Sequence, residues 1–182
     1  MDSAPSAAIA ERFGTLFDTL DSDNDATLAW DDYQRLVGRY TEGYSLDADD
    51  ARAGAIRAAY RGLWDELVRR SGTDGDGLDR EAFVGAMRAV SEDTSRSNPT
   101  EALADAVFDL LDDDDNGSIS EAEYVEYAQV LGATVDTAWE RFRALDTDGD
   151  GTISREEFIQ SGREFLFGAD TDSAGGFVFG MV

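Results

Sequence analysis

The stretch DTDGDGTISREE, from Asp146 to Glu157, decides how the rest of the sequence is interpreted. Aspartates occupy its first, third and fifth places, and a glutamate stands at its twelfth. A hard dication takes about 6–8 oxygen ligands at about 2.3–2.6 Å, and alternate residues of a tight loop can point their oxygens at one centre. The spacing therefore predicts a calcium site, to which the seventh residue adds its backbone carbonyl. The predicted ligands are Asp146, Asp148, Asp150, Thr152 and Glu157.

A second stretch, DDDDNGSISEAE from Asp112 to Glu123, repeats this pattern upstream. The sixth place holds Gly117 here and Gly151 in the other loop, and glycine reaches the positive φ of a sharp turn at little cost. Two complete matches to D-x-[DN]-x-[DN]-G-x5-E indicate EF-hands, in which such a loop joins two helices. A solvated acidic turn is the less favoured interpretation. The predicted ligands of this loop are Asp112, Asp114, Asn116, Ser118 and Glu123.

The first loop in chain order, DSDNDATLAWDD from Asp21 to Asp32, departs from the pattern at two places. Ala26 replaces the sixth-place glycine, and a Cβ in the left-handed region costs roughly 1–2 kcal/mol. Asp32 replaces the twelfth-place glutamate and is one methylene shorter. We expect this loop to bind calcium more weakly and to admit Mg²⁺ more readily, with a vestigial loop as the alternative. The predicted ligands are Asp21, Asp23, Asp25, Thr27 and Asp32.

The stretch from Ser71 to Phe83 reads as a degenerate second hand. When it is aligned on the apolar residues of the complete loops, Gly72 takes the first ligand place and Ala82 the twelfth. We predict that it has lost its metal and persists because EF-hands pair through their loops. A weak site built from Asp74, Asp76 and Asp79 is the alternative.

Apolar residues at helical spacing flank every loop, and the longest such stretch covers residues 47–70. The predicted fold class is all-α: a compact EF-hand protein with four helix-loop-helix hands in two pairs, the second hand degenerate. The polar, proline-ended stretch 91–99 predicts a linker. We therefore divide the chain into residues 1–92, with hands 1 and 2, and residues 93–182, with hands 3 and 4 and an apolar tail.

The tail, residues 167–182, is too rich in glycine for a stable helix, yet it carries several large apolar residues. We expect it to fold onto the core or to cap a groove, with a frayed tail as the alternative. A fifth site at Asp170 and Asp172 is disfavoured, because the twelfth place of such a loop would be Met181.

Composition narrows the classes of function. Forty acidic residues against 15 basic ones give a net charge of −25, which disfavours nucleic acid and anionic membranes as partners. The chain has no Cys and no His, so disulfides, thiol catalysis and the commonest general base are excluded. We expect no enzymatic activity.

The start of the chain lacks the basic segment followed by an apolar segment that marks a signal peptide, and no apolar run has the length of a membrane span. A cytoplasmic monomer is therefore expected.

Four hands at unequal spacing, with a long helical segment between the first two loops, resemble the sarcoplasmic calcium-binding proteins and their prokaryotic calerythrin group. The degenerate second hand, the Asp at the end of the first loop, and the segment from Phe165 to Gly168 share in the resemblance, which covers nearly the whole chain. It implies a compact α-helical protein that acts as a calcium buffer or transporter. The Ala26 departure sets the first loop apart from that pattern.

Three functions remain open on the sequence alone. The favoured one is a buffer that binds about three calcium ions and compacts on binding, with Mg²⁺ competing chiefly at the first site. A calcium sensor would expose a groove for a target protein, and known sensors have Met-rich grooves, whereas this chain has three Met in all. A carrier of a small apolar ligand would use a cavity lined by Trp30, Trp64, Trp139 and the tail.

Overall fold

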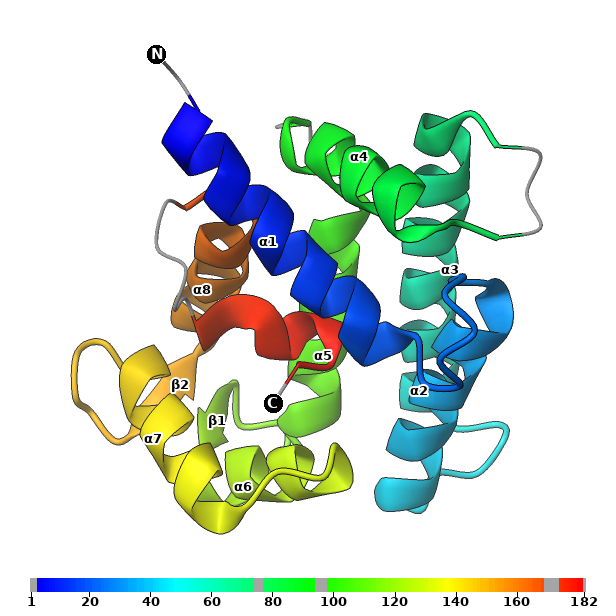
Figure 1. Ribbon diagram of the computed structural model, residues 1–182. Helices are drawn as coiled ribbons and strands as arrows, with labels where there is room; N and C mark the ends of the chain where they lie inside the picture. The colour runs from blue at the N-terminus through cyan, green and yellow to red at the C-terminus, as the bar shows by residue number, and fades with distance from the viewer. Residues whose placement is uncertain (1–2, 74–76, 94–97, 169–173, 182) are drawn as a thin grey trace.

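The computed structural model describes residues 3–73, 77–93, 98–168 and 174–181. Eight α-helices, two short strands and one 3₁₀ helix make up this part of the chain, which confirms the predicted all-α EF-hand fold (Figure 1). The elements are α1 Ser3–Leu20, α2 Trp30–Gly43, α3 Ala51–Ser71, α4 Arg80–Ser91, α5 Pro99–Leu111, β1 Ser118–Ser120, α6 Glu121–Val130, α7 Val135–Leu145, β2 Thr152–Ser154, α8 Arg155–Phe167 and η1 Ala174–Phe179.

The four helix-loop-helix units associate in two pairs through their loops. In the first pair, Leu28 and Leu78 exchange two backbone hydrogen bonds of 2.8 Å. In the second pair, β1 and β2 run antiparallel, with Ile119 opposite Ile153. All four side chains are buried, so apolar residues at the eighth loop place stabilise each pair of loops.

The degenerate second hand thus keeps its pairing contact. Asp79 caps α4 by accepting a hydrogen bond from the N–H of Ala82, and Asp74 and Asp76 of the alternative weak site lie outside the described residues.

Helices α3 to α8 each begin after a residue whose side chain accepts a hydrogen bond from one of the first free N–H groups of the helix. The long helix α3 begins at Ala51 and not at Asp47 as predicted, because Asp50 accepts a hydrogen bond of 2.8 Å from the N–H of Arg52. Helices α6 and α8 begin with capping boxes, formed by Ser120 with Glu123 and by Ser154 with Glu157. The twelfth-place glutamate of each complete loop therefore also starts its outgoing helix.

One continuous apolar core joins all eight helices. At its centre, Tyr40 of α2 stacks on Tyr60 of α3 and on Tyr127 of α6, with ring centroids 6.2 and 5.8 Å apart. The hydroxyl oxygen of Tyr40 lies 3.2 Å from that of Tyr60 and 3.3 Å from that of Tyr127. Burial raises the pKa of all three phenols, so they are neutral and can donate. Because this cluster joins side chains from residues 1–92 and 93–182, the two halves share a core, and their division into two domains stays a prediction.

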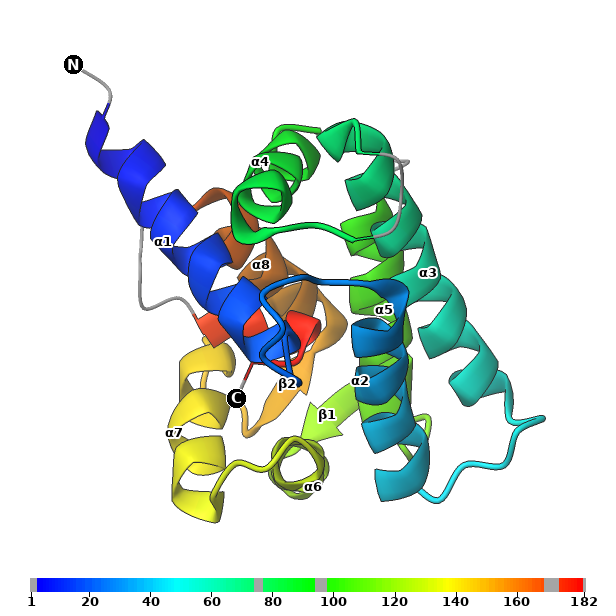
Figure 2. The same ribbon diagram turned by 45° about the vertical axis from the view of Figure 1, so that its right-hand side comes forward.

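The tail segment, residues 174–181, packs inside this core. The 3₁₀ helix η1 packs against α8, α7 and α5, and it lies beside the end of α1 in Figure 1 and behind α1 in Figure 2. Phe177, Val178 and Phe179 are buried. The hydroxyl of Tyr127 donates to the carbonyl of Phe177, and that of Tyr60 lies 3.4 Å from the carbonyl of Val178. This segment is packed, not frayed, while Asp170 and Asp172 of the disfavoured fifth site lie outside the described residues.

Glycine allows the tail to approach α8 closely. A Cβ on Gly175 would lie 1.9 Å from the carbonyl oxygen of Ser161, a distance that no side chain can occupy. The glycine content that argued against a helix is thus what brings the backbone of η1 against α8.

Candidate metal centre

The loop from Asp146 to Glu157 is folded around its own carboxylates. Asp146 Oδ1 accepts hydrogen bonds from the N–H groups of Gly149 and Asp150, and its Oδ2 accepts one of 3.0 Å from Gly151. Gly151 has φ of +90°, as the sixth place requires. Side-chain oxygens of the first, third and twelfth residues, Asp146, Asp148 and Glu157, lie within 4.8 Å of one another.

Glu157 is held at the loop by both of its oxygens. Its Oε2 accepts from the N–H and the hydroxyl of Ser154, each at 2.8 Å. Its Oε1 accepts from the N–H of Thr147 at 2.9 Å and from its hydroxyl at 2.8 Å. Burial tends to raise the pKa of Glu157, but these hydrogen bonds outweigh it and lower the pKa to about 2. The group is therefore a carboxylate at neutral pH, which a calcium ligand must be.

The loop from Asp112 to Glu123 has the same construction. Asp112 accepts hydrogen bonds of 2.9 Å from the N–H groups of Asn116 and Gly117. Glu123 accepts from the N–H of Ser120 at 2.7 Å and from that of Asp113 at 3.0 Å. Asp112, Asp114 and Glu123 again bring carboxylate oxygens within 4.8 Å of one another.

The fifth and seventh places of these two loops are tied to each other. Asp150 Oδ1 accepts hydrogen bonds of 2.8 Å from the N–H and the hydroxyl of Thr152. Asn116 Oδ1 accepts from the N–H of Ser118 at 2.9 Å and from its hydroxyl at 2.7 Å. The predicted fifth- and seventh-place ligands thus lie beside the converging carboxylates and share hydrogen bonds with one another.

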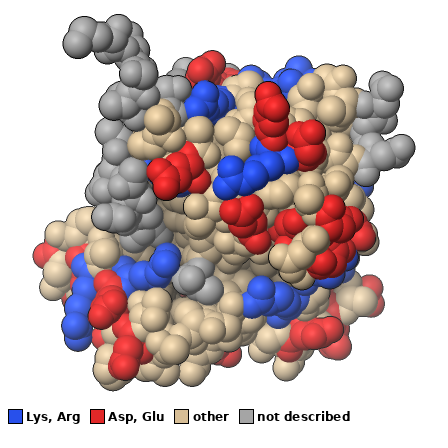
Figure 3. All heavy atoms as spheres, viewed as in Figure 1, with Lys and Arg blue, Asp and Glu red and all other residues tan. Residues whose placement is uncertain are grey.

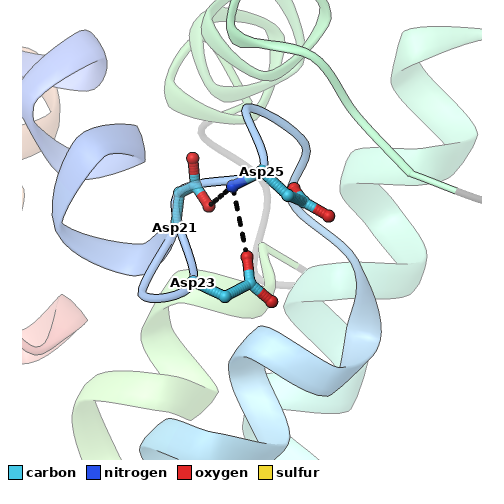
Figure 4. Close-up of side chains that lie close together, drawn as sticks. All are labelled: Asp21, Asp23 and Asp25. Atoms are coloured by element: carbon cyan, nitrogen blue, oxygen red, sulfur yellow. Dashed lines mark hydrogen bonds between the residues drawn. The ribbon is translucent and has the colours of Figure 1, made fainter.

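The loop from Asp21 to Asp32 closes in the same way at its first half. Asp21 accepts from the N–H groups of Asp25 at 3.1 Å and Ala26 at 3.0 Å. Figure 4 shows the carboxylates of Asp21 and Asp23 beside the backbone nitrogen of Asp25, whose N–H donates to both of them. The three carboxylates have oxygens within 4.8 Å of one another. Thr27 donates its N–H to Asp25 Oδ1 at 2.8 Å.

The second half of this loop differs from the others. Asp32 is not in the converging group. Asp25, at the fifth place, is its third member instead. The Oδ2 of Asp32 accepts a hydrogen bond of 2.8 Å from the N–H of Ala29, and its Oδ1 contacts the guanidinium of Arg35. Burial raises the pKa of Asp32, and the contacts with Ala29 and Arg35 lower it only in part. Sequence reasoning missed Arg35, although an arginine three residues after the twelfth place was a visible signal.

The oxygen groups fit a calcium ion. Two oxygens bound to one ion at about 2.3–2.6 Å can lie at most about 5 Å apart. The three carboxylates of each loop meet that limit, and every donor in them is a hard oxygen. Loop 3, from Asp112 to Glu123, and loop 4, from Asp146 to Glu157, can therefore take calcium through their first, third and twelfth residues, while loop 1, from Asp21 to Asp32, offers its first, third and fifth.

Strain at Ala26 gives a testable prediction. Ala26 has φ of 65°, in the left-handed region that costs a residue with a Cβ roughly 1–2 kcal/mol. Replacing it by glycine relieves that strain but frees the unfolded chain, which costs about 0.4–1 kcal/mol. We expect Ala26→Gly to raise the free energy of unfolding by about 0.5–1 kcal/mol in urea denaturation. Ala55→Gly, at an exposed helical site, should instead lower it by about 1 kcal/mol. If both variants lose stability equally, the loop is not strained at Ala26.

Two families match the chain directly. The EF-hand domain pair matches residues 74–131, and the EF hand matches residues 140–160. Calerythrin of Saccharopolyspora erythraea is 26% identical over 166 residues, which are 89% of this chain and 94% of calerythrin. The sarcoplasmic calcium-binding protein of Perinereis vancaurica tetradentata is 26% identical over 128 residues, 70% of this chain and 72% of that protein.

Solved structures share the fold. The calcium-binding protein described in prokaryotic calcium-mediated regulation in Streptomyces coelicolor superposes with a TM-score of 0.72 at 23% identity, covering 89% of this chain and 99% of that one. The coelenterazine-binding protein of Renilla muelleri, in its calcium-loaded apo form, superposes with a TM-score of 0.68 at 22% identity over the whole of both chains.

The fold and the acidic loops together are those of the EF-hand calcium-binding proteins, whose family models match residues 74–131 and 140–160. Within that class, the chain resembles calerythrin and the sarcoplasmic calcium-binding proteins, as the sequence predicted. No helix in the described part of the chain combines the length and the hydropathy that crossing a membrane would require.

Proposed function

We propose that this protein is a calcium buffer that binds about three calcium ions through loops 1, 3 and 4 and exposes no groove when it does so. One observation carries the proposal: the loops have their carboxylates gathered as for an ion, and the apolar core is closed at the same time. In a sensor, calcium opens a hand and exposes apolar surface. Among the described residues, the large apolar side chains that stay exposed are Trp139 and Phe167, at 41% and 44%.

Charge supports a role in holding cations. The net charge is −25, and acidic side chains on the face seen in Figure 3 lie among arginines that neutralise them only in part. Each bound calcium ion lowers the repulsion among these carboxylates, so binding should stabilise the folded chain. A cytoplasmic, monomeric protein without catalytic activity fits this role, and light scattering on a sized sample would test the monomer.

The sensor is the alternative, because the related fold from Streptomyces coelicolor is described in calcium-mediated regulation. A calcium titration separates the two functions. With magnesium present in excess, we expect helix content to rise on adding calcium and the binding of a dye for exposed apolar surface to fall. A rise in dye binding at saturation would instead mean that a groove opens, and the buffer proposal would be wrong.

The carrier of an apolar ligand has less support. Trp64 is buried at 4% exposure and Trp139 lies on the surface at 41%, so the tryptophans do not line one cavity together. The tail fills the centre of the core, and the pocket between it, α5 and α8 has a volume of about 10 Å³, which is at most what one water molecule requires. A larger pocket of about 330 Å³ lies beside loop 4, but Glu156, Glu157 and Glu164 line it.

A further inference from the structure

Arg35 joins the two ends of loop 1. From α2, its Nε donates to the hydroxyl of Ser22 at 2.9 Å, and its Nη1 donates to Asp31 at 3.3 Å. Its Nη2 donates to Asp23 at 2.8 Å and also to Asp32. The guanidinium thus contacts the carboxylates of the third and twelfth loop places together. Those are two of the oxygen donors that the loop motif assigns to the metal.

Arg35 also meets a need of the loop. The side chain of Asp32 is 2% exposed, and a buried carboxylate is costly unless a cation or hydrogen-bond donors compensate it. A guanidinium stays charged at every pH that a protein tolerates, and its planar fork suits several carboxylate oxygens. A surface ion pair alone would be worth little, but this one compensates a buried charge.

The complete loops have no counterpart of Arg35. The residues three places after their twelfth position are Glu126 and Gln160. In both of those loops the twelfth-place glutamate joins the first and third carboxylates, whereas Asp32 of loop 1 stands apart from its group. The loop that carries an arginine is therefore the loop whose twelfth carboxylate lies outside the converging group.

We propose that Arg35 is a built-in cation of loop 1, which competes with calcium for Asp23 and Asp32. The inference rests on the proposed function, since it concerns how one of the calcium loops is regulated. At low calcium, the guanidinium keeps loop 1 folded by neutralising its third and twelfth carboxylates. Calcium must displace the guanidinium from both, so loop 1 has the lowest calcium affinity of the three and fills last.

The test uses Arg35→Gln beside Arg163→Gln as a matched control. Arg163 pairs with Glu101 at an exposed site on α5 and α8, so both variants lose one positive charge, but only Arg35→Gln removes a cation from the carboxylates of loop 1. Terbium, a luminescent substitute for calcium, reports on loop 1 because Trp30 at its tenth place can sensitise it, while loops 3 and 4 contain no aromatic residue. Trp30→Phe should remove this signal and so verify its origin. Calcium is then titrated against bound terbium, and loops 3 and 4 are followed by calorimetry.

We expect Arg35→Gln to bind calcium at loop 1 at least about tenfold more tightly than Arg163→Gln, with loops 3 and 4 unchanged; tenfold is about 1.4 kcal/mol. In the presence of a chelator, Arg35→Gln should also unfold at a lower temperature than Arg163→Gln, because its loop 1 carboxylates then lack a cation. Equal loop 1 affinities in the two variants, with loops 3 and 4 still binding, would overturn this inference and leave the proposed function intact. Absence of calcium binding at loops 3 and 4 in the unaltered protein would overturn the proposed function itself.

Discussion

Replacing Phe177 by alanine is expected to lower the free energy of unfolding by about 3–5 kcal/mol, the usual cost of removing a large aromatic side chain from a core. The ring of Phe177 is fully buried. It meets the ring of Phe158 edge to face at 4.6 Å between centroids and that of Tyr124 at 5.9 Å. The short helix η1 makes few other contacts of this size. The substitution therefore removes its main packing contact with α8 and α6.

Phe167→Ala is the matched control for this prediction. Phe167 ends α8 and is 44% exposed, so the same change in composition should cost less than about 1 kcal/mol. Urea denaturation of both variants, in chelator and in calcium, measures the difference. Equal losses in the two variants would mean that the tail segment does not stabilise the core.

Replacing Glu157 by glutamine is expected to weaken calcium binding at loop 4 by more than about a hundredfold. Changing a residue that only supports a metal ligand typically costs about 10–100-fold in affinity. Glu157 is itself a predicted ligand, and glutamine has one oxygen and no charge where the carboxylate can bind through both oxygens. Calorimetric titration should show one calcium fewer at micromolar concentrations, with loop 3 retained.

Glu156→Gln controls for the change of charge. Glu156 is the neighbouring residue, is exposed, and lies outside the ligand pattern. We expect its effect on loop 4 to be small. If the two variants bind calcium alike, or if Glu157→Gln keeps full stoichiometry at normal affinity, Glu157 is not a ligand and the assignment of loop 4 is wrong.

Much of this molecule could be predicted from local sequence. The loop motif fixes ligands by their spacing within twelve residues, and helices flank each loop at a 3.6-residue period, so neither needs knowledge of distant parts of the chain. The fold class and the resemblance to calerythrin followed from these features. The start of α3 was misplaced by four residues, because Asp50 caps the helix and the apolar pattern alone does not mark its first residue.

Two features depend on contacts that local patterns do not encode. Arg35 lies in α2, and its side chain reaches back to Ser22 and Asp23 at the start of loop 1, so its role appears only when loop and helix are folded together. The tail lacks an α-helical pattern, and its Gly175 instead lets the backbone of the 3₁₀ helix η1 approach α8 closely. Its place in the core is set by contacts of Phe177 with Tyr127, 50 residues earlier in the sequence, and with Phe158 of α8.

The position of η1 has a consequence for how the chain is made. A ribosome delivers residues in order, and domains usually fold as they emerge. Here, the hands of residues 3–168 leave the ribosome before the segment that fills the centre between them. Until residues 174–181 follow, the hydroxyls of Tyr60 and Tyr127 lack the carbonyls of Val178 and Phe177 as hydrogen-bond acceptors. The rings of Tyr124 and Phe158 likewise lack their contacts with the ring of Phe177. Nascent chains should therefore pass through a state in which the apolar side chains around η1 are exposed. In that state chaperones can bind the chain, and it can aggregate with other chains.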